Sequence, residues 1–133
     1  MYLNPFVVAA FFLATSSIAQ AVTLDCALKP NSDALGYVTE RYVLQHDEAS
    51  GQAVASDALI LHFNEKPIAA KVSEDTPKKL VLTWAVQLTN STGQITKMLF
   101  RASYFKADGS VIVRAVPSGY SNQFEARGRC KKV

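Results

Sequence analysis

The feature that most constrains the fold is a stretch of strict alternation, KLVLTWAVQLT, from Lys79 to Thr89. Every second side chain is large and apolar, and those between are mostly smaller or more polar. The apolar set comprises Leu80, Leu82, Trp84, Val86 and Leu88. A helix would distribute these residues around its circumference, but a strand places all of them on one face of a sheet. The stretch therefore predicts a β-strand with one buried face.

The segment NSTGQ that follows predicts a hairpin. Gly93 can supply the positive φ that a three-residue bulged loop requires. The resulting register sets Trp84 opposite Phe100, whereas a loop longer by one residue would set Val86 against Lys97. The side-chain pattern favours the first register, because it keeps the apolar residues on one face. The expected core residues are Trp84, Phe100, Leu82, Val86 and Tyr104.

Further strands are expected on both sides of this hairpin. Asp108-Gly109 is typical of a tight type I′ turn, which would pair Tyr104 with Val113 and give strands over about 79–90, 94–107 and 110–117. Alternation predicts the other strands, which are Tyr37–His46, QAVAS (52–56), ALILHF (58–63) and PIAAKVS (67–73). No segment is predicted to be helical. We expect one all-β domain over 22–133, an antiparallel β-barrel or closed β-sandwich of about eight or nine strands.

The two cysteines, Cys26 and Cys130, lie near the two ends of that domain. In TLDCALK and in FEARGRC, each cysteine falls on the apolar face of a predicted terminal strand. Two cysteines in an oxidising compartment normally pair. A disulfide would join the first strand to the last and close the sheet, leaving no unprotected edge.

The first 21 residues are predicted to be an export signal. The apolar run FVVAAFFLA (6–14) is too short to span a bilayer, and Ala19 and Ala21 form a small-x-small cleavage site. We expect cleavage after Ala21 and a periplasmic or secreted protein. Because MYLNP contains no Lys or Arg, an uncleaved anchor is the alternative. No later segment is apolar enough to cross a membrane.

The net charge of +3 comes from one end of the chain, because Arg127, Arg129, Lys131 and Lys132 lie within its last seven residues. Without these four the remainder carries +3 − 4 = −1. Nucleic-acid binders usually spread basic and aromatic residues over a face, so we expect no nucleic-acid partner. We expect a monomer whose partner is a protein or a small apolar ligand.

No motif indicates catalysis, a cofactor or a metal. The two histidines, His46 and His62, have no spacing that would bring them together with a third ligand or a nucleophile. We therefore expect an exported binding protein without enzymatic activity. A small hydrolase is the least favoured alternative.

Two surfaces are candidates for binding a partner. The loop PSGYSNQF offers Ser118, Gly119, Tyr120 and Asn122, and Tyr120 could either enter a partner's cleft or fold back over the end of the barrel. The outward face of the three central strands carries an apolar set rimmed by cations. This set comprises Ile95, Leu99, Phe105, Ile112 and Val116.

Several short segments of the chain together resemble one group of proteins. The export signal, Cys26, SDALILHF, STGQ and the closing pattern P-x-G-Y-x-N-x-F-x-x-x-G-x-C (117–130) resemble uncharacterised small exported proteins of proteobacteria. That resemblance implies export and a β fold but no activity. Ser118, Gly119 and Tyr120 are also similar to the Ser-Gly…Tyr loop of periplasmic inhibitors of C-type lysozymes, which are small disulfide-bearing β-barrels. This similarity implies, as an alternative, an inhibitor of a cell-wall hydrolase acting through loop 117–123.

Overall fold

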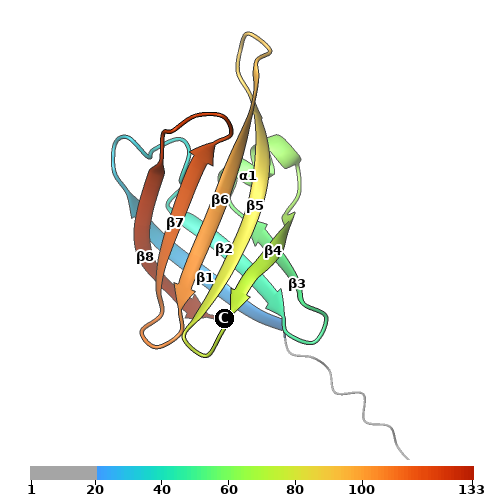
Figure 1. Cartoon of the computed structure of the whole chain (residues 1–133), viewed down its shortest axis with the longest axis vertical. Helices are drawn as coiled ribbons and strands as arrows, with labels where there is room; N and C mark the ends of the chain where they lie inside the picture. The colour runs from blue at the N-terminus through green and yellow to red at the C-terminus, as the bar shows by residue number, and fades with distance from the viewer. Residues whose placement is uncertain (1–20) are drawn as a thin grey trace, which may run out of the picture.

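The computed structural model describes residues 21–133, and these form one closed antiparallel barrel in which each strand pairs with the next along the chain (Figure 1). The elements are β1 (Ala21–Pro30), β2 (Arg41–Asp47), β3 (Gln52–Ser56), α1 (Ala58–Asn64), β4 (Ile68–Asp75), β5 (Lys79–Thr89), β6 (Ile95–Phe105), β7 (Ser110–Pro117) and β8 (Phe124–Lys132). The prediction of a closed all-β domain of eight or nine strands is confirmed, and the number is eight. The predicted signal peptide lies outside the described residues, apart from Ala21. Within 21–133, the structure contains no helix with the length and hydropathy needed to cross a membrane.

The barrel closes where β1 pairs with β8, and the predicted disulfide lies on this seam. Cys26 is directly opposite Cys130, and their sulfurs are bonded. Two residues earlier on β8, Gly128 lies opposite Leu28. A Cβ atom on Gly128 would overlap the backbone of Ala27 and Leu28, so the two strands can approach this closely only at a glycine.

The β5–β6 hairpin has the predicted register. Trp84 faces Phe100, the Asn90 N–H donates to the Gln94 carbonyl at 3.0 Å, and Gly93 has a φ of 80°. The Trp84 and Phe100 rings stack with centroids 5.6 Å apart, and Tyr42 packs on Trp84 from across the barrel at 5.9 Å. All five expected core residues are buried in this interior. The barrel is therefore filled by side chains at its middle.

The predicted turn between β6 and β7 was wrong by two residues. Tyr104 pairs with Val111 rather than Val113, so that four residues, 106–109, form the turn. The Gly109 N–H donates to the Phe105 carbonyl at 2.9 Å, and Asp108 accepts from the Ser110 N–H. The shift is an even number of residues, so it leaves the same side chains facing inward.

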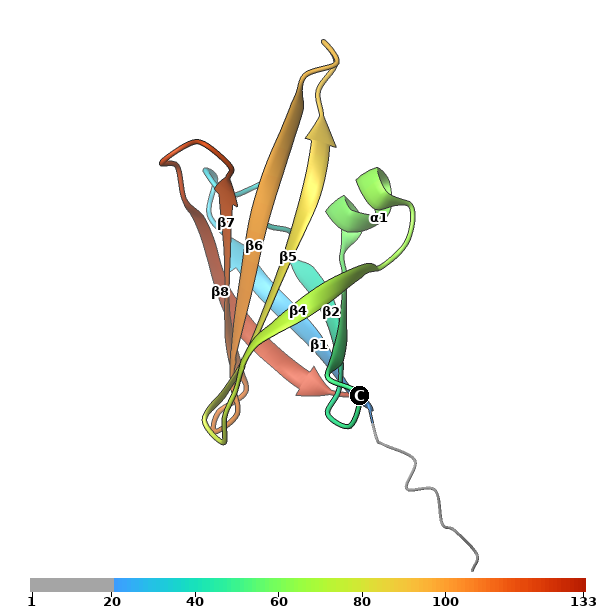
Figure 2. The same cartoon turned by 45° about the vertical axis from the view of Figure 1, so that its right-hand side comes forward.

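The segment 58–63 was predicted to be a strand, and it is the core of helix α1. Asp57 caps this helix by accepting a hydrogen bond from the Ile60 N–H at 2.7 Å. Leu59 and Phe63 alternate as a strand would require, but they are also one helical turn apart. Figure 2 shows α1 beside the upper part of β5, at the end of the barrel where the β5–β6 hairpin projects.

The strand predicted over Tyr37–His46 is shorter than expected, because β2 begins only at Arg41. Residues 31–40 form a loop of turns instead, in which Asn31 accepts from the Ala34 N–H and Gly36 has a φ of 93°. This loop lies at the same end of the barrel as α1 and the β7–β8 loop (Figure 1). Three connections and one projecting hairpin therefore surround this open end.

Candidate functional site

The open end of the barrel contains a cavity of about 440 Å³. Its walls come from the β1–β2 loop, α1, the β5–β6 hairpin and the start of β8. The apolar lining residues are Tyr37, Leu59, Phe63, Leu88, Met98, Tyr120 and Phe124. The polar lining residues are Thr89, Asn90, Gln94, Thr96 and Asn122. No Asp, Glu, Lys or Arg is among the residues that line it. We call this cavity the mouth pocket.

One wall of the mouth pocket depends on the cap of α1. The Asp57 carboxylate accepts from the Ile60 N–H and also from the Thr39 hydroxyl, at 2.7 Å each. These bonds tie the helix to the β1–β2 loop and direct Leu59 and Phe63 toward the pocket. Burial, together with the nearby Asp57 carboxylate, raises the pKa of Tyr42, which therefore stays protonated beneath this wall.

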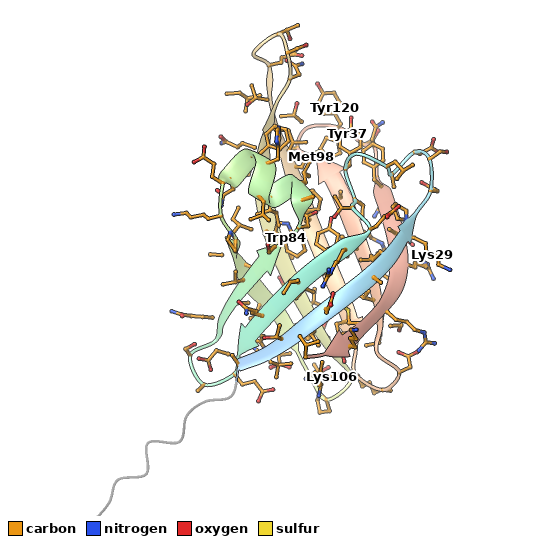
Figure 3. All side chains as sticks on the ribbon, turned by 180° about the vertical axis from the view of Figure 1, so that it is seen from behind. Lys29, Tyr37, Trp84, Met98, Lys106 and Tyr120 are labelled. Carbon is orange, nitrogen blue, oxygen red and sulfur yellow. A yellow bond between two sulfur atoms is a disulfide. The ribbon has the colours of Figure 1, made fainter. Side chains whose placement is uncertain are left out.

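The opposite wall is a pair of stacked aromatic rings. Tyr37 of the β1–β2 loop and Phe124 at the start of β8 have centroids 4.5 Å apart and planes inclined by 20°. The contact joins the β1–β2 loop to the start of β8, which is far away in the sequence but adjacent across the seam. In Figure 3, Tyr37 and Tyr120 lie together at this end of the barrel. An aromatic rim of this kind can pack on a flat apolar group while its hydroxyls stay in water.

The floor of the mouth pocket is Met98, and the barrel below it is packed. Met98 lies between the tyrosine rim and Trp84 in Figure 3. Trp84 Nε1 is the one fully enclosed side-chain polar atom within 21–133 that has no hydrogen-bond partner. Because stacked rings occupy the layer below Met98, a ligand would enter the mouth but would not run through the barrel.

The candidate partner loop forms part of the same rim. The Ser118 N–H donates to the Lys97 carbonyl at 2.8 Å, and the Tyr120 N–H donates to the Pro117 carbonyl at 3.1 Å. Tyr120 and Asn122 line the mouth pocket, and Tyr120 nevertheless remains 65% exposed. Tyr120 thus borders the pocket and is also available to a larger partner.

The candidate apolar set on the outer face is spread along the strands. Ile95 and Phe105 are the first and last residues of β6, so they are about 33 Å apart at the usual rise of a strand. Ile95 and Leu99 are exposed, whereas Phe105 and Ile112 are partly buried. Only Leu99 and Val116 are direct cross-strand partners within this set. The structure does not gather these residues into one patch.

A group of side chains that could ligate a metal ion lies at the other end of the barrel. His46 at the end of β2, Glu48 in the β2–β3 turn and Asp75 at the end of β4 place one ligand atom each within 4.8 Å of one another. Sequence patterns did not predict this cluster, because Asp75 joins it only through the folding of the barrel. His62 is elsewhere, on α1, with its ring against Phe63.

The residues of the pocket wall were also missed by sequence reasoning, because they come from a segment predicted to be a strand. Asp57, a typical N-cap residue before ALILHF, was the available signal. No protein-family model, no curated protein and no solved structure matches this chain. What the protein binds is therefore inferred from the chemistry of the mouth pocket and its rim.

Proposed function

We propose that this chain is an exported, non-catalytic binding protein that holds a small uncharged ligand in the mouth pocket. The observation that supports this most is a cavity of about 440 Å³ with a mixed apolar and polar lining that includes no charged residue. This volume lies within the range of about 300–1,000 Å³ that is usual for small-molecule sites. The disulfide supports the periplasm or the extracellular space as the location, because such bonds persist in oxidising compartments.

The lining supports one kind of ligand. Leu59, Leu88 and Met98 would cover an apolar body, and Tyr37 and Tyr120 would pack on its exposed part. The remaining polar groups are carboxamides and hydroxyls, which can donate or accept hydrogen bonds but cannot neutralise a charge. A carboxylate, phosphate or ammonium group would lose its hydration in the pocket without gaining a partner. The ligand is therefore uncharged, with an apolar part and one or two polar groups.

The test compares two tryptophan substitutions at neighbouring positions of the same strand. Thr96→Trp would fill the mouth pocket from β6, whereas Ile95→Trp would add the same side chain on the exposed outer face. The probe is the neutral dye N-phenyl-1-naphthylamine, whose fluorescence rises in an apolar site. We expect saturable binding to the unmodified protein and to Ile95→Trp, and at least about tenfold weaker binding to Thr96→Trp.

A charged analogue of the probe tests the absence of charge in the lining. The anionic dye 1-anilinonaphthalene-8-sulfonate should bind more weakly than the neutral dye at the same site. Equal loss of neutral-dye binding in Thr96→Trp and Ile95→Trp would reject the mouth pocket as the site. Tighter binding of the anionic dye would reject the proposed ligand class.

A second candidate function is inhibition of a cell-wall hydrolase through loop 117–123. The observation that favours it is the 65% exposure of Tyr120 at the rim, where the ring can enter a cleft. Tyr120→Ala should abolish inhibition of a muramidase while leaving the melting temperature nearly unchanged. Leu61→Ala, which truncates an exposed apolar residue outside the mouth pocket, is the matched control. Equal inhibition by Tyr120→Ala and the unmodified protein would eliminate this function.

A further inference from the structure

A bulge in β4 turns Asp75 toward the interior at the end of the barrel opposite the mouth pocket. The β4–β5 register shifts between Val72 and Glu74, and beyond the shift Asp75 is opposite Leu80, a buried core residue. Residues directly opposite each other in an antiparallel pair point to the same face. Without the extra residue, Asp75 would share the outward face of Lys71 and Ser73. Bulges of this kind commonly re-aim one side chain.

His46 faces the same space from β2. It is only 5% exposed as a residue, yet neither imidazole nitrogen is among the fully enclosed polar atoms without a partner, so solvent or a ligand can reach this ring. A ligand nitrogen of His46 and one oxygen each from Glu48 and Asp75 all lie within 4.8 Å of one another. One largely buried imidazole facing two exposed carboxylates has a donor set that a transition-metal ion accepts.

We propose that His46, Glu48 and Asp75 bind a divalent transition-metal ion, with zinc as the first candidate. One imidazole nitrogen and two carboxylate oxygens are ligands that zinc accepts, and a solvent molecule can complete a tetrahedron. Magnesium and calcium prefer oxygen ligands alone, so the imidazole selects against them. The site is independent of the mouth pocket, because β2 and β4 end at the opposite end of the barrel from Tyr120.

Lys106 competes for one of the three ligands. Its Nζ atom is 2.7 Å from Asp75 Oδ1, and Figure 3 shows Lys106 at the end of the barrel away from the tyrosine rim. A bound ion would use the other Asp75 oxygen or displace the lysine. The ion would also connect β2 to β4 across β3, which lies between them. Metal binding should therefore stabilise this end of the folded barrel.

The experiment is calorimetric titration of the untagged, disulfide-bonded protein with zinc chloride. We expect one ion per chain and a higher melting temperature with zinc. Glu48→Gln, which changes one exposed side chain in a turn, should weaken zinc binding at least about tenfold. Glu40→Gln in the β1–β2 loop is its matched control and should bind zinc normally. Lys106→Gln removes the competing cation and should tighten binding.

The histidines provide a second comparison. His46→Ala should lose zinc binding, whereas His62→Ala, which removes the other histidine of the chain, should retain it. No free cysteine competes for zinc within 21–133. If His46→Ala fails to fold, Glu48→Gln decides the question alone. Unchanged zinc affinity in Glu48→Gln, equal loss in His62→Ala, or calcium binding as tight as zinc binding would overturn the proposal.

Discussion

Gly128 is the residue on which the close approach of β1 and β8 depends. A Cβ at this position would overlap the backbone of Ala27 and Leu28, and backbone cannot move aside as a flexible side chain can. We predict that Gly128→Ala destabilises the fold by about 3 kcal/mol, the upper end of the usual cost of overpacking. Urea unfolding measures the change.

Lys131→Ala, at an exposed position of the same strand, is the control and should change stability little. If Gly128→Ala were as stable as Lys131→Ala, the close approach of β1 and β8 would be contradicted.

Glu125 links stability to pH on the outer face of β7 and β8. Hydrogen bonds from Arg114, which has the larger effect, and from Arg127 hold the pKa of the Glu125 carboxyl below its usual value. A depressed pKa in the folded state means that the unfolded chain binds the proton first as pH falls. The stabilisation is therefore present above the unfolded pKa, near 4.3, and is lost as pH falls through the folded value.

This linkage predicts a particular pH profile for Glu125→Gln. The variant should have a lower melting temperature than the unmodified protein at pH 7, and the difference should shrink between about pH 5 and pH 3. Melting curves across this range measure it. Glu40→Gln, whose side chain has no salt bridge within 21–133, should follow the unmodified protein throughout. A difference that grows on acidification would contradict the assigned ion pairs.

At the scale of elements, the N-terminal cap of α1 holds one wall of the mouth pocket in place. Asp57→Ala removes the acceptor of the Ile60 N–H and of the Thr39 hydroxyl, so we predict a loss of about 1–2 kcal/mol in stability. Neutral-dye binding should weaken as well, because the wall formed by Leu59 and Phe63 is no longer fixed. Denaturation and dye titration are measured together. Asp33→Ala, at an exposed position of the β1–β2 loop, is the control. If Asp57→Ala bound the dye as tightly as Asp33→Ala, the cap of α1 would not be needed for the pocket to bind a ligand.

The sequence was sufficient to predict β5 and β6, because a long alternating stretch and one glycine turn specify both the strands and their register. It was insufficient for ALILHF, because Leu59 and Phe63 fit both a period of two and a helical turn. Asp57 caps the helix locally through the Ile60 N–H, and it also accepts from the Thr39 hydroxyl, 18 positions away in the sequence. The local alternation of apolar and polar residues cannot reveal a contact between residues so far apart in the sequence.

The candidate site was predictable only in part for the same reason. Tyr120 and Asn122 were identified because their loop has a distinctive composition. Tyr37 was assigned to a strand, and its partner Phe124 is reached only across the closed seam. The cluster of His46 and Asp75 also needs a β-bulge, for which alternation gives no warning.

At the scale of the whole molecule, the disulfide fixes the two terminal strands. In the chain-entropy model, a bridge that closes a loop of about 100 residues contributes about 4.7 kcal/mol. We predict that the double variant Cys26→Ala/Cys130→Ala loses about 4–5 kcal/mol of unfolding free energy, as urea unfolding would measure. In the unmodified protein, neither thiol should react with an alkylating agent before reduction. Alkylation of both without reduction would contradict the closed seam.

The mouth pocket is tested most directly by the methyl resonance of Met98, one of only two methionines in the chain. Met98 forms the floor of the pocket, and its neighbour Leu99 points to the outer face. On titration with N-phenyl-1-naphthylamine, the Met98 methyl signal should shift progressively to saturation, while the Leu99 methyl signals remain in place. An unchanged Met98 signal together with shifted Leu99 signals would contradict binding at the mouth and place the ligand on the outer surface.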